Sequence, residues 1–139
     1  RAMLRNRQGF NLVEMMVLIG IFGLLAAISL PAFGRYTRTN RVSTSVSRLA
    51  ADLQFARATA IANGRTIRVA MDGNGYRIID TVTGNIIANR TLERGVNVDS
   101  TAVRFFPWGM ADAATIDVGC DVAGHRQVNL LPTGAVEVD

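Results

Sequence analysis

A single carboxylate, Glu14, lies near the start of a long stretch that holds no other charge. Residues 1–9 before it carry three arginines and no acid, and the next charge after Glu14 is Arg35. A charge among apolar groups is energetically costly, so a residue of this kind usually has a function and a partner. The chemistry that this spacing offers is electrostatic pairing in apolar surroundings.

Catalytic chemistry has little support in the sequence. Cys120 is the only cysteine and His125 the only histidine, so no internal disulfide can form and no zinc site can be completed. Residues 73–75 (Gly-Asn-Gly) indicate a hairpin turn rather than a phosphate-binding loop. We therefore expect no enzymatic activity, no metal and no cofactor. Cys120 is expected to be a small buried core residue and His125 a surface or loop residue.

The element that carries Glu14 is long enough to cross a membrane. Phe10 to Phe33 is 24 residues long, and a helix of that length spans about 36 Å, against about 30 Å for the hydrocarbon core. A secretory signal peptide has a shorter apolar core, and an ordinary single-pass anchor gives Glu14 no role. The basic N-terminus favours a cytoplasmic start, with the C-terminal head on the outer side of the membrane.

A second helical pattern follows the membrane segment. Apolar residues recur at steps of four and three, which is one face of an amphipathic helix, and Asn63-Gly64 is a stop signal. We predict one helix from about Phe10 to Ala62, with a membrane part over residues 10–33 and an amphipathic stalk over residues 34–63. The apolar positions of the stalk are Val42, Val46, Leu49, Leu53, Ala56 and Ala60.

Arginines lie mostly off this apolar stripe, at Arg35, Arg38, Arg41 and Arg48. A solvated face, or pairing with lipid phosphates, explains them, and a DNA-binding stripe is the alternative. The chain carries a net charge of +4, but three of its 15 basic residues lie in residues 1–9. The positive balance is therefore largely a property of that leader, and it supports nucleic-acid binding only weakly.

Beyond Gly64 the pattern changes to short strands separated by turns. Alternating apolar residues and Gly-containing turns predict antiparallel pairing, with the helix laid on the sheet in an α+β head over residues 64–139. Phe105, Phe106 and Trp108 are expected to fill the core, whereas an exposed Trp108 would indicate a subunit contact. The expected strands are at about residues 66–71, 76–80, 86–92, 96–98, 103–106, 115–120, 127–131 and 135–138.

The N-terminal quarter resembles the class III signal of the type IV pilin and type II secretion pseudopilin superfamily. The resemblance rests on residues 5–9 (Arg-Asn-Arg-Gln-Gly), residues 10–17 (Phe-Asn-Leu-Val-Glu-Met-Met-Val) and residues 24–33 (Leu-Leu-Ala-Ala-Ile-Ser-Leu-Pro-Ala-Phe). The usual pattern is a basic leader ending in Gly, then Phe-Thr-Leu-Ile-Glu, and a Pro farther along the apolar run. Asn11 replaces the commoner Thr.

This resemblance assigns roles to four residues. It implies that a prepilin peptidase cuts between Gly9 and Phe10, which removes residues 1–9 as a leader and leaves Phe10 as a methylated N-terminus. It also implies that Glu14 pairs with the Phe10 amine of a neighbouring subunit and sets the axial register of a filament. Pro31 removes a backbone hydrogen bond and is expected to kink the helix.

The head resembles the GspH/FimT-like minor pilins and pseudopilins. Residues 49–65 are similar to the family's helix end, residues 105–109 (Phe-Phe-Pro-Trp-Gly) to its F-x-P-x-G segment, and residues 131–134 (Leu-Pro-Thr-Gly) to its closing hairpin. Some FimT-like members bind DNA through a Gly-Arg-x-Arg hairpin tip. Residues 134–137 read Gly-Ala-Val-Glu here, without either arginine and with an added acid, so the sequence disfavours direct DNA binding.

The sequence thus predicts a pilin-like α+β fold and a structural minor pseudopilin of a type II secretion pseudopilus. The expected partners are other pilin or pseudopilin subunits, the prepilin peptidase and the bacterial inner membrane, with the head in the periplasm. The alternative is a minor pilin of a type IV pilus, related to DNA uptake.

Overall fold

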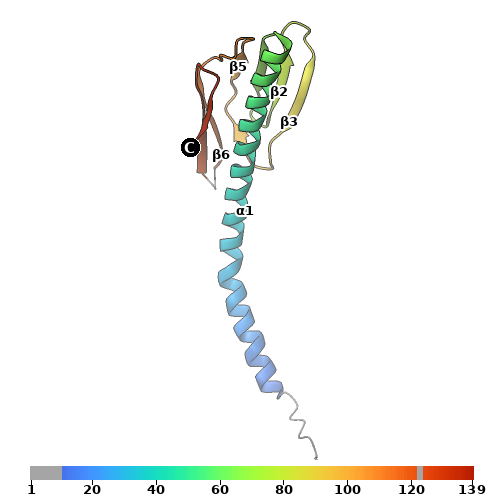
Figure 1. Cartoon of the computed structure of the whole chain (residues 1–139). Helices are drawn as coiled ribbons and strands as arrows, with labels where there is room; N and C mark the ends of the chain where they lie inside the picture. Colours follow the sequence, from blue (N-terminus) through green and yellow to red (C-terminus); the bar gives the residue numbers. More distant parts are fainter. Residues whose placement is uncertain (1–10, 122–123) are drawn as a thin grey trace, which may run out of the picture. The chain divides into compact units, whose positions relative to one another are not determined.

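The computed structural model describes residues 11–121 and 124–139, and only the backbone of residues 30–32. The chain divides into two compact units, Arg1–Tyr36 and Thr37–Asp139. One helix, α1 (Leu12–Asn63), contributes to both units (Figure 1). The long helix expected from the sequence is therefore confirmed over the described residues.

The first unit consists of the N-terminal part of α1. This part is long and apolar enough to cross a membrane by length and composition, and none of its most apolar window is buried by the rest of the chain. Leu12, for example, is 73% exposed. The helix continues without a break through residue 31. Its apolar side chains therefore need cover from a membrane or from other chains.

At its C-terminal end α1 stops at a glycine, as the sequence predicts. Gly64 has a φ of +61°, a left-handed conformation that glycine adopts without a steric penalty. The Gly64 amide donates to the Ile61 carbonyl at 3.3 Å, and the Arg65 amide donates to the Ala60 carbonyl at 3.1 Å. This pair of bonds is a Schellman motif, which ends the helix and satisfies two of its last carbonyls.

The second unit combines the rest of α1 with two antiparallel four-stranded sheets. The first sheet has the order β3-β2-β1-β5 and the second the order β4-β6-β7-β8. All eight strands predicted from the sequence are present, with ends that differ by at most three residues. The strands are β1 (Ile67–Met71), β2 (Gly75–Asp80), β3 (Ile86–Thr91), β4 (Asn97–Val98), β5 (Ala102–Phe105), β6 (Ala114–Cys120), β7 (Gly124–Leu130) and β8 (Val136–Val138).

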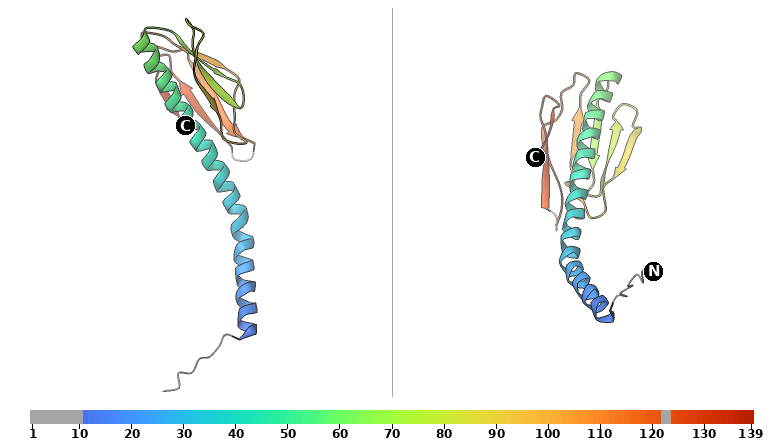
Figure 2. Two further views of the ribbon diagram at one scale, coloured as in Figure 1. Left: turned by 90° about the vertical axis from the view of Figure 1, so that its right-hand side faces the viewer. Right: turned by 60° about the horizontal axis from the view of Figure 1, so that its bottom comes forward.

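The core of the second unit lies between α1 and the two sheets (Figure 2). Every position of the predicted apolar stripe, from Val42 to Ala60, is at most 2% exposed. Facing side chains come from both sheets, including Ile78 in the first sheet and Ile116 in the second. The helix therefore holds the two sheets together by covering apolar residues of both.

Two expectations about the core are wrong. Trp108 is 69% exposed and Phe106 is only partly buried, whereas Phe105 is fully buried. The reason is that Phe105 ends strand β5, while the next residues form a turn on the surface, so the alternation of the strand no longer directs them inward. Cys120 is half-buried rather than fully buried, because it packs against the edge of the core at the end of β6.

Candidate functional site

The predicted processing and register residues lie at the start of the chain. Gly9 and Phe10 fall outside the described residues. Glu14 lies in the first turn of α1, with an exposed side chain that makes no ion pair to any other described residue. Its neighbours along the helix are exposed apolar side chains, such as Val13 and Met15. Within the described part of the chain, Glu14 is thus a carboxylate on an uncovered apolar surface.

Asn11 caps this helix in place of the usual threonine. Its side-chain Oδ1 accepts a hydrogen bond from the Val13 amide at 3.4 Å, and its carbonyl accepts one from the Met15 amide at 3.1 Å. Asparagine and threonine are both favoured at the helix N-cap because each offers a side-chain oxygen to the first amides. The departure from the usual motif at this position therefore keeps the capping chemistry.

Arg57 joins the three head segments on which the family resemblance rests. It lies in α1, its Nε donates to the Gly109 carbonyl at 3.0 Å, and its Nη2 donates to the Thr133 carbonyl at 2.9 Å. A β-carbon added at Gly134 would collide with the Gly109 carbonyl oxygen and meet Arg57 Nε at 2.8 Å. One guanidinium therefore ties the helix to the 105–109 segment and to the closing hairpin.

Three side chains, those of Arg104, Phe106 and Trp108, stack on one another in and next to the 105–109 segment. The rings of Phe106 and Trp108 are parallel, with centroids 5.1 Å apart, and the guanidinium of Arg104 lies 5.6 Å from the Phe106 centroid. Arg104 is held by Asp112, with Nε and Oδ2 2.8 Å apart. This hydrogen bond raises the pKa of Arg104 and lowers the pKa of Asp112. The exposed Trp108 ring is thus held in place by its stacking on Phe106.

Asp52 links α1 to the first sheet. Its Oδ2 accepts a hydrogen bond from the Tyr76 hydroxyl at 2.7 Å and one from Arg90 Nε at 3.2 Å. Burial, together with the hydrogen bond to Asp52, raises the pKa of the Tyr76 hydroxyl well above its usual range. The tyrosine therefore stays neutral and acts as a hydrogen-bond donor.

The turn between β2 and β3 is held by a second carboxylate, Asp80. Its Oδ1 accepts hydrogen bonds from the Val82 amide at 2.9 Å and the Thr83 amide at 3.3 Å, and Arg65 lies 3.2 Å away. The bond from Val82, aided by Arg65, lowers the pKa of Asp80. Asp80 therefore stabilises this turn of the head.

Of the two residues considered for catalysis, Cys120 lines a pocket together with Asp121, and His125 is not among the residues that line it. His125 is exposed on β7, and its Nδ1 lies 3.3 Å from Asp117 Oδ1 on the neighbouring strand. Among residues 11–121 and 124–139, no group of three or more His, Cys, Asp or Glu side chains is placed to hold a metal ion.

No role was assigned to Asp52 or Arg57 from the sequence, although Arg57 lies within residues 49–65, which resemble the family's helix end. Arg57 bonds to two backbone carbonyls that lie 52 and 76 residues away along the chain, and such acceptors leave no pattern in a single sequence. A further signal is that each of the two polar residues lies next to a buried position of the apolar stripe, where a polar side chain needs a partner.

Comparisons with known proteins agree with this geometry. Residues 45–134 match the family described as "Type II transport protein GspH". The type IV major fimbrial protein FimA of Dichelobacter nodosus is 32% identical over 90 residues, which is 60% of this chain and 56% of that protein. The chain thus spans little more than half the length of this relative. A type IV major pilin of Neisseria gonorrhoeae is 29% identical over 149 residues, covering 89% of this chain and 82% of that protein.

Solved structures share the fold. The type IV minor pilin FimU of Pseudomonas aeruginosa superposes with a TM-score of 0.62 at 20% identity, over 75% of this chain and 92% of that one. The minor pseudopilin EpsH of Vibrio cholerae superposes with a TM-score of 0.60 at 15% identity, over 71% and 96%. Because the family match covers well over half of the residues, the chain belongs to the GspH family of minor pilins and pseudopilins.

Proposed function

We propose that this chain is a structural, non-enzymatic minor pseudopilin of a type II secretion pseudopilus. A prepilin peptidase cuts between Gly9 and Phe10 and methylates Phe10. Residues 10–33 hold the subunit in the inner membrane, with the head in the periplasm, until it joins other pseudopilins in a filament. The observation that carries this proposal is the apolar helix from Leu12 to Phe33, in which nearly all of the described side chains are exposed and one carboxylate lies in the first turn.

Glu14 is the residue that this proposal makes essential. An unpaired carboxylate in apolar surroundings destabilises the structure that contains it. A positive partner offsets this cost, and the resulting pair contributes more to the specificity of subunit arrangement than to net stability. The N-terminal amine that cleavage creates at Phe10 is such a partner when it comes from a neighbouring subunit. Because the amine belongs to Phe10 of one chain and Glu14 lies four residues farther along the sequence of the next chain, the pair sets the axial offset between subunits.

The test compares Glu14→Ala with Val17→Ala, which trims the same helix without removing a charge. We expect Glu14→Ala to be cleaved and methylated normally but to be missing from the subunit complexes that are cross-linked in intact cells and isolated from the cell envelope. Val17→Ala should be both processed and incorporated. Normal incorporation of Glu14→Ala would remove the register role.

Mass spectrometry of the mature N-terminus tests the processing step separately. We expect the mass of a chain that starts at a methylated Phe10. A mature chain that still carries residues 1–9 would contradict the proposal, whatever the behaviour of Glu14.

The alternative is a minor pilin of a type IV pilus, which the fold shared with FimU and the type IV pilin relatives favour. Deleting the gene separates the two functions. Loss of secreted enzymes with intact surface pili supports the pseudopilin, and loss of pili with intact secretion supports the pilin. A salt-sensitive gel shift with DNA would favour a DNA-uptake pilin, which the acidic Glu137 in β8, next to the closing hairpin, disfavours.

A further inference from the structure

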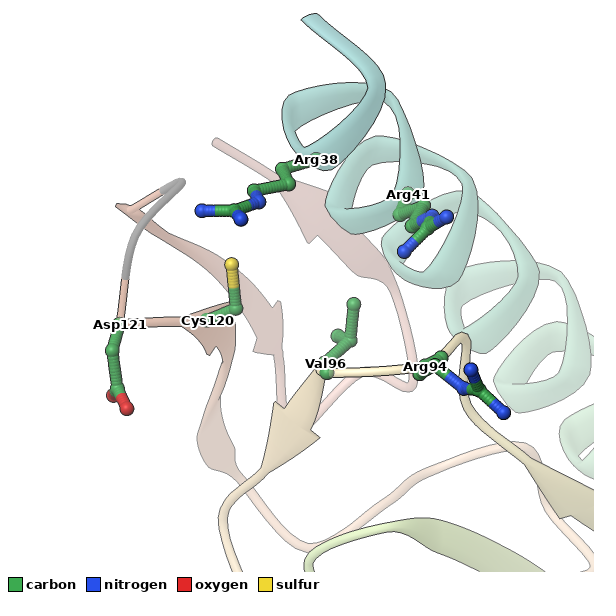
Figure 3. Close-up of a pocket in the computed structure, with 7 residues that line it drawn as sticks. Arg38, Arg41, Arg94, Val96, Cys120 and Asp121 are labelled. Carbon is green, nitrogen blue, oxygen red and sulfur yellow. The ribbon is translucent and has the colours of Figure 1, made fainter. Parts of the chain in front are cut away.

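A pocket in the second unit is lined by arginines from two distant segments. It measures about 280 Å³ and lies between Arg38 and Arg41 on α1, the 94–96 turn, and Cys120 with Asp121 at the end of β6 (Figure 3). This size is near the lower end of the range for small-molecule sites. The pocket is distinct from the Arg57 and Trp108 region and from Glu14.

The fold presents each of these arginines. Arg38 and Arg41 are three residues apart and so lie side by side on the surface of α1. Arg94 is the second residue of a tight turn in which the Val96 amide donates to the Glu93 carbonyl at 3.0 Å. Gly95, the third residue, has a φ of +82°, as a type II turn requires. Val96 anchors this turn, since it is only 3% exposed.

The pocket has an excess of positive charge. Arg38, Arg41 and Arg94 are exposed, and in the described part of the chain no carboxylate lies within ion-pair distance of any of them. Asp121 is the one acid in the lining, and its carboxylate points away from the helix that carries the arginines (Figure 3). The arginines therefore lack an anion in the isolated chain.

A phosphate group matches this chemistry. The guanidinium group stays charged at all physiological pH values and offers paired N–H donors that fit phosphate oxygens. Arg38 is the fifth residue after Phe33, the last residue of the membrane segment. Five residues span at most about 18 Å even when extended and about 8 Å in a helix. If residues 10–33 span the membrane, the arginine cannot be far from the lipid headgroups.

We propose that Arg38, Arg41 and Arg94 form a pocket for the phosphate of an anionic membrane lipid, which binds the head before the subunit leaves the membrane. This inference rests on the proposed membrane anchoring of residues 10–33. When the subunit enters the growing filament, the lipid must then leave the pocket, or a neighbouring subunit must take its place there. An acidic segment of a partner subunit is the competing occupant, and it is an outcome of the test.

Cys120 makes the proposal measurable, because it is the only cysteine and lines the pocket. The full mature chain is placed in nanodiscs of phosphatidylcholine, or of phosphatidylcholine with phosphatidylglycerol, and the rate of Cys120 alkylation by an uncharged maleimide is measured. We expect alkylation to be about fivefold slower in the anionic discs, because a lipid phosphate bound by the arginines covers the thiol; a fivefold change corresponds to about 1 kcal/mol. Co-purification of the chain with the discs reports membrane insertion independently.

The variants Arg94→Gln and Arg38→Gln should lose this protection, and Arg68→Gln should keep it. Arg68 is an exposed arginine on β1, outside the pocket. Comparing the two disc compositions within each variant cancels any direct effect of an arginine on the thiol. Protection that persists in Arg94→Gln reflects surface potential alone and overturns the proposal.

Two further arms distinguish the source of the anion. Inorganic phosphate added to phosphatidylcholine discs should protect Cys120 far less than the lipid does; equal protection would assign the pocket to free phosphate. Protection that appears only when other pseudopilins are added would assign it to a partner's carboxylates. Failure of the chain to co-purify with discs of either composition contradicts the membrane anchoring instead.

Discussion

Arg57 shows how a single side chain can hold together segments that the sequence keeps far apart. Its two hydrogen bonds reach Gly109 and Thr133, and Gly134 leaves the space that the guanidinium occupies. Both acceptors are backbone carbonyls with fixed positions, so the planar guanidinium can meet them together. A lysine ammonium is a compact point charge on a flexible stem and cannot reproduce this pair of bonds.

We therefore predict that Arg57→Ala lowers the free energy of unfolding of the head by about 2 kcal/mol, since it removes two hydrogen bonds from a charged donor. Arg57→Lys should recover less than half of this loss. The measurement is urea unfolding of a fragment that starts at Thr37, which contains every residue of the core. Arg68→Ala, on an exposed strand position, is the control and should change the value little. An equal effect of both substitutions would contradict the clamp.

For single residues, the sequence predicted a role only where the role depends on neighbours in the chain. Glu14 stands out because its neighbours are apolar, and the buried stripe from Val42 to Ala60 follows from helical spacing. Arg57 could not be predicted, because its partners depend on how the loops fold back to the helix. Of the pocket lined by Arg38, Arg41 and Arg94, the sequence indicated only the two helical arginines, which are close together in the chain. Arg94 comes from a distant turn, and its place beside them could not be predicted.

At the scale of elements, the helix and strands were predictable, whereas the division into two sheets was not. Periodicity and turns specify where β1 and β2 begin and end, and their hairpin pairing is local. The pairing of β1 with β5 and of β4 with β6 joins segments that are distant in sequence. Such pairings depend on how α1 covers both sheets, which no local pattern records.

The segment after β5 shows the same limit. Hydrophobicity alone predicted that Trp108 lies in the core. In the structure Trp108 belongs to a turn in which the Gly109 amide donates to the Phe106 carbonyl at 2.9 Å. This turn places the Trp108 ring on the surface. A large ring that is held rigidly by stacking and left exposed is suited to a protein contact, because little entropy is lost when it is covered.

We predict that Trp108→Ala separates assembly from stability. It should change the free energy of unfolding of the head by less than about 1 kcal/mol, since an exposed ring contributes little to folding. Filament incorporation of the full chain should nevertheless fall. Phe105→Ala is the matched comparison, because it empties a fully buried site and should cost about 3–5 kcal/mol. Normal incorporation of a stable Trp108→Ala variant would exclude the ring from the subunit contact.

At the scale of the whole molecule, the head behaves as one unit because polar contacts reinforce the apolar core across elements. Tyr76 is the clearest case, since it lies in β2, is 1% exposed, and donates to Asp52 on α1. Ionising this hydroxyl would place a phenolate in the core beside a carboxylate. The tyrosine therefore cannot lose its proton unless the contact between helix and sheet opens.

This coupling predicts how stability depends on alkaline pH. Burial and Asp52 raise the pKa of Tyr76 in the folded head, while the unfolded value stays near about 10. A group whose folded pKa is raised stabilises fully below its unfolded pKa and loses that contribution as pH rises beyond it. The free energy of unfolding should therefore fall progressively above about pH 10.

The chain offers a direct measurement of this loss. It contains two tyrosines and no lysine, and a fragment that begins at Thr37 leaves out Tyr36, so phenolate absorbance in the fragment reports Tyr76 alone. We expect phenolate to appear together with the loss of circular dichroism, as one cooperative transition. In Tyr76→Phe the alkaline decline should flatten, although the starting stability is lower because Asp52 loses a donor. Ionisation near the ordinary tyrosine pKa with the fold intact would show that Tyr76 does not link the helix to the sheet.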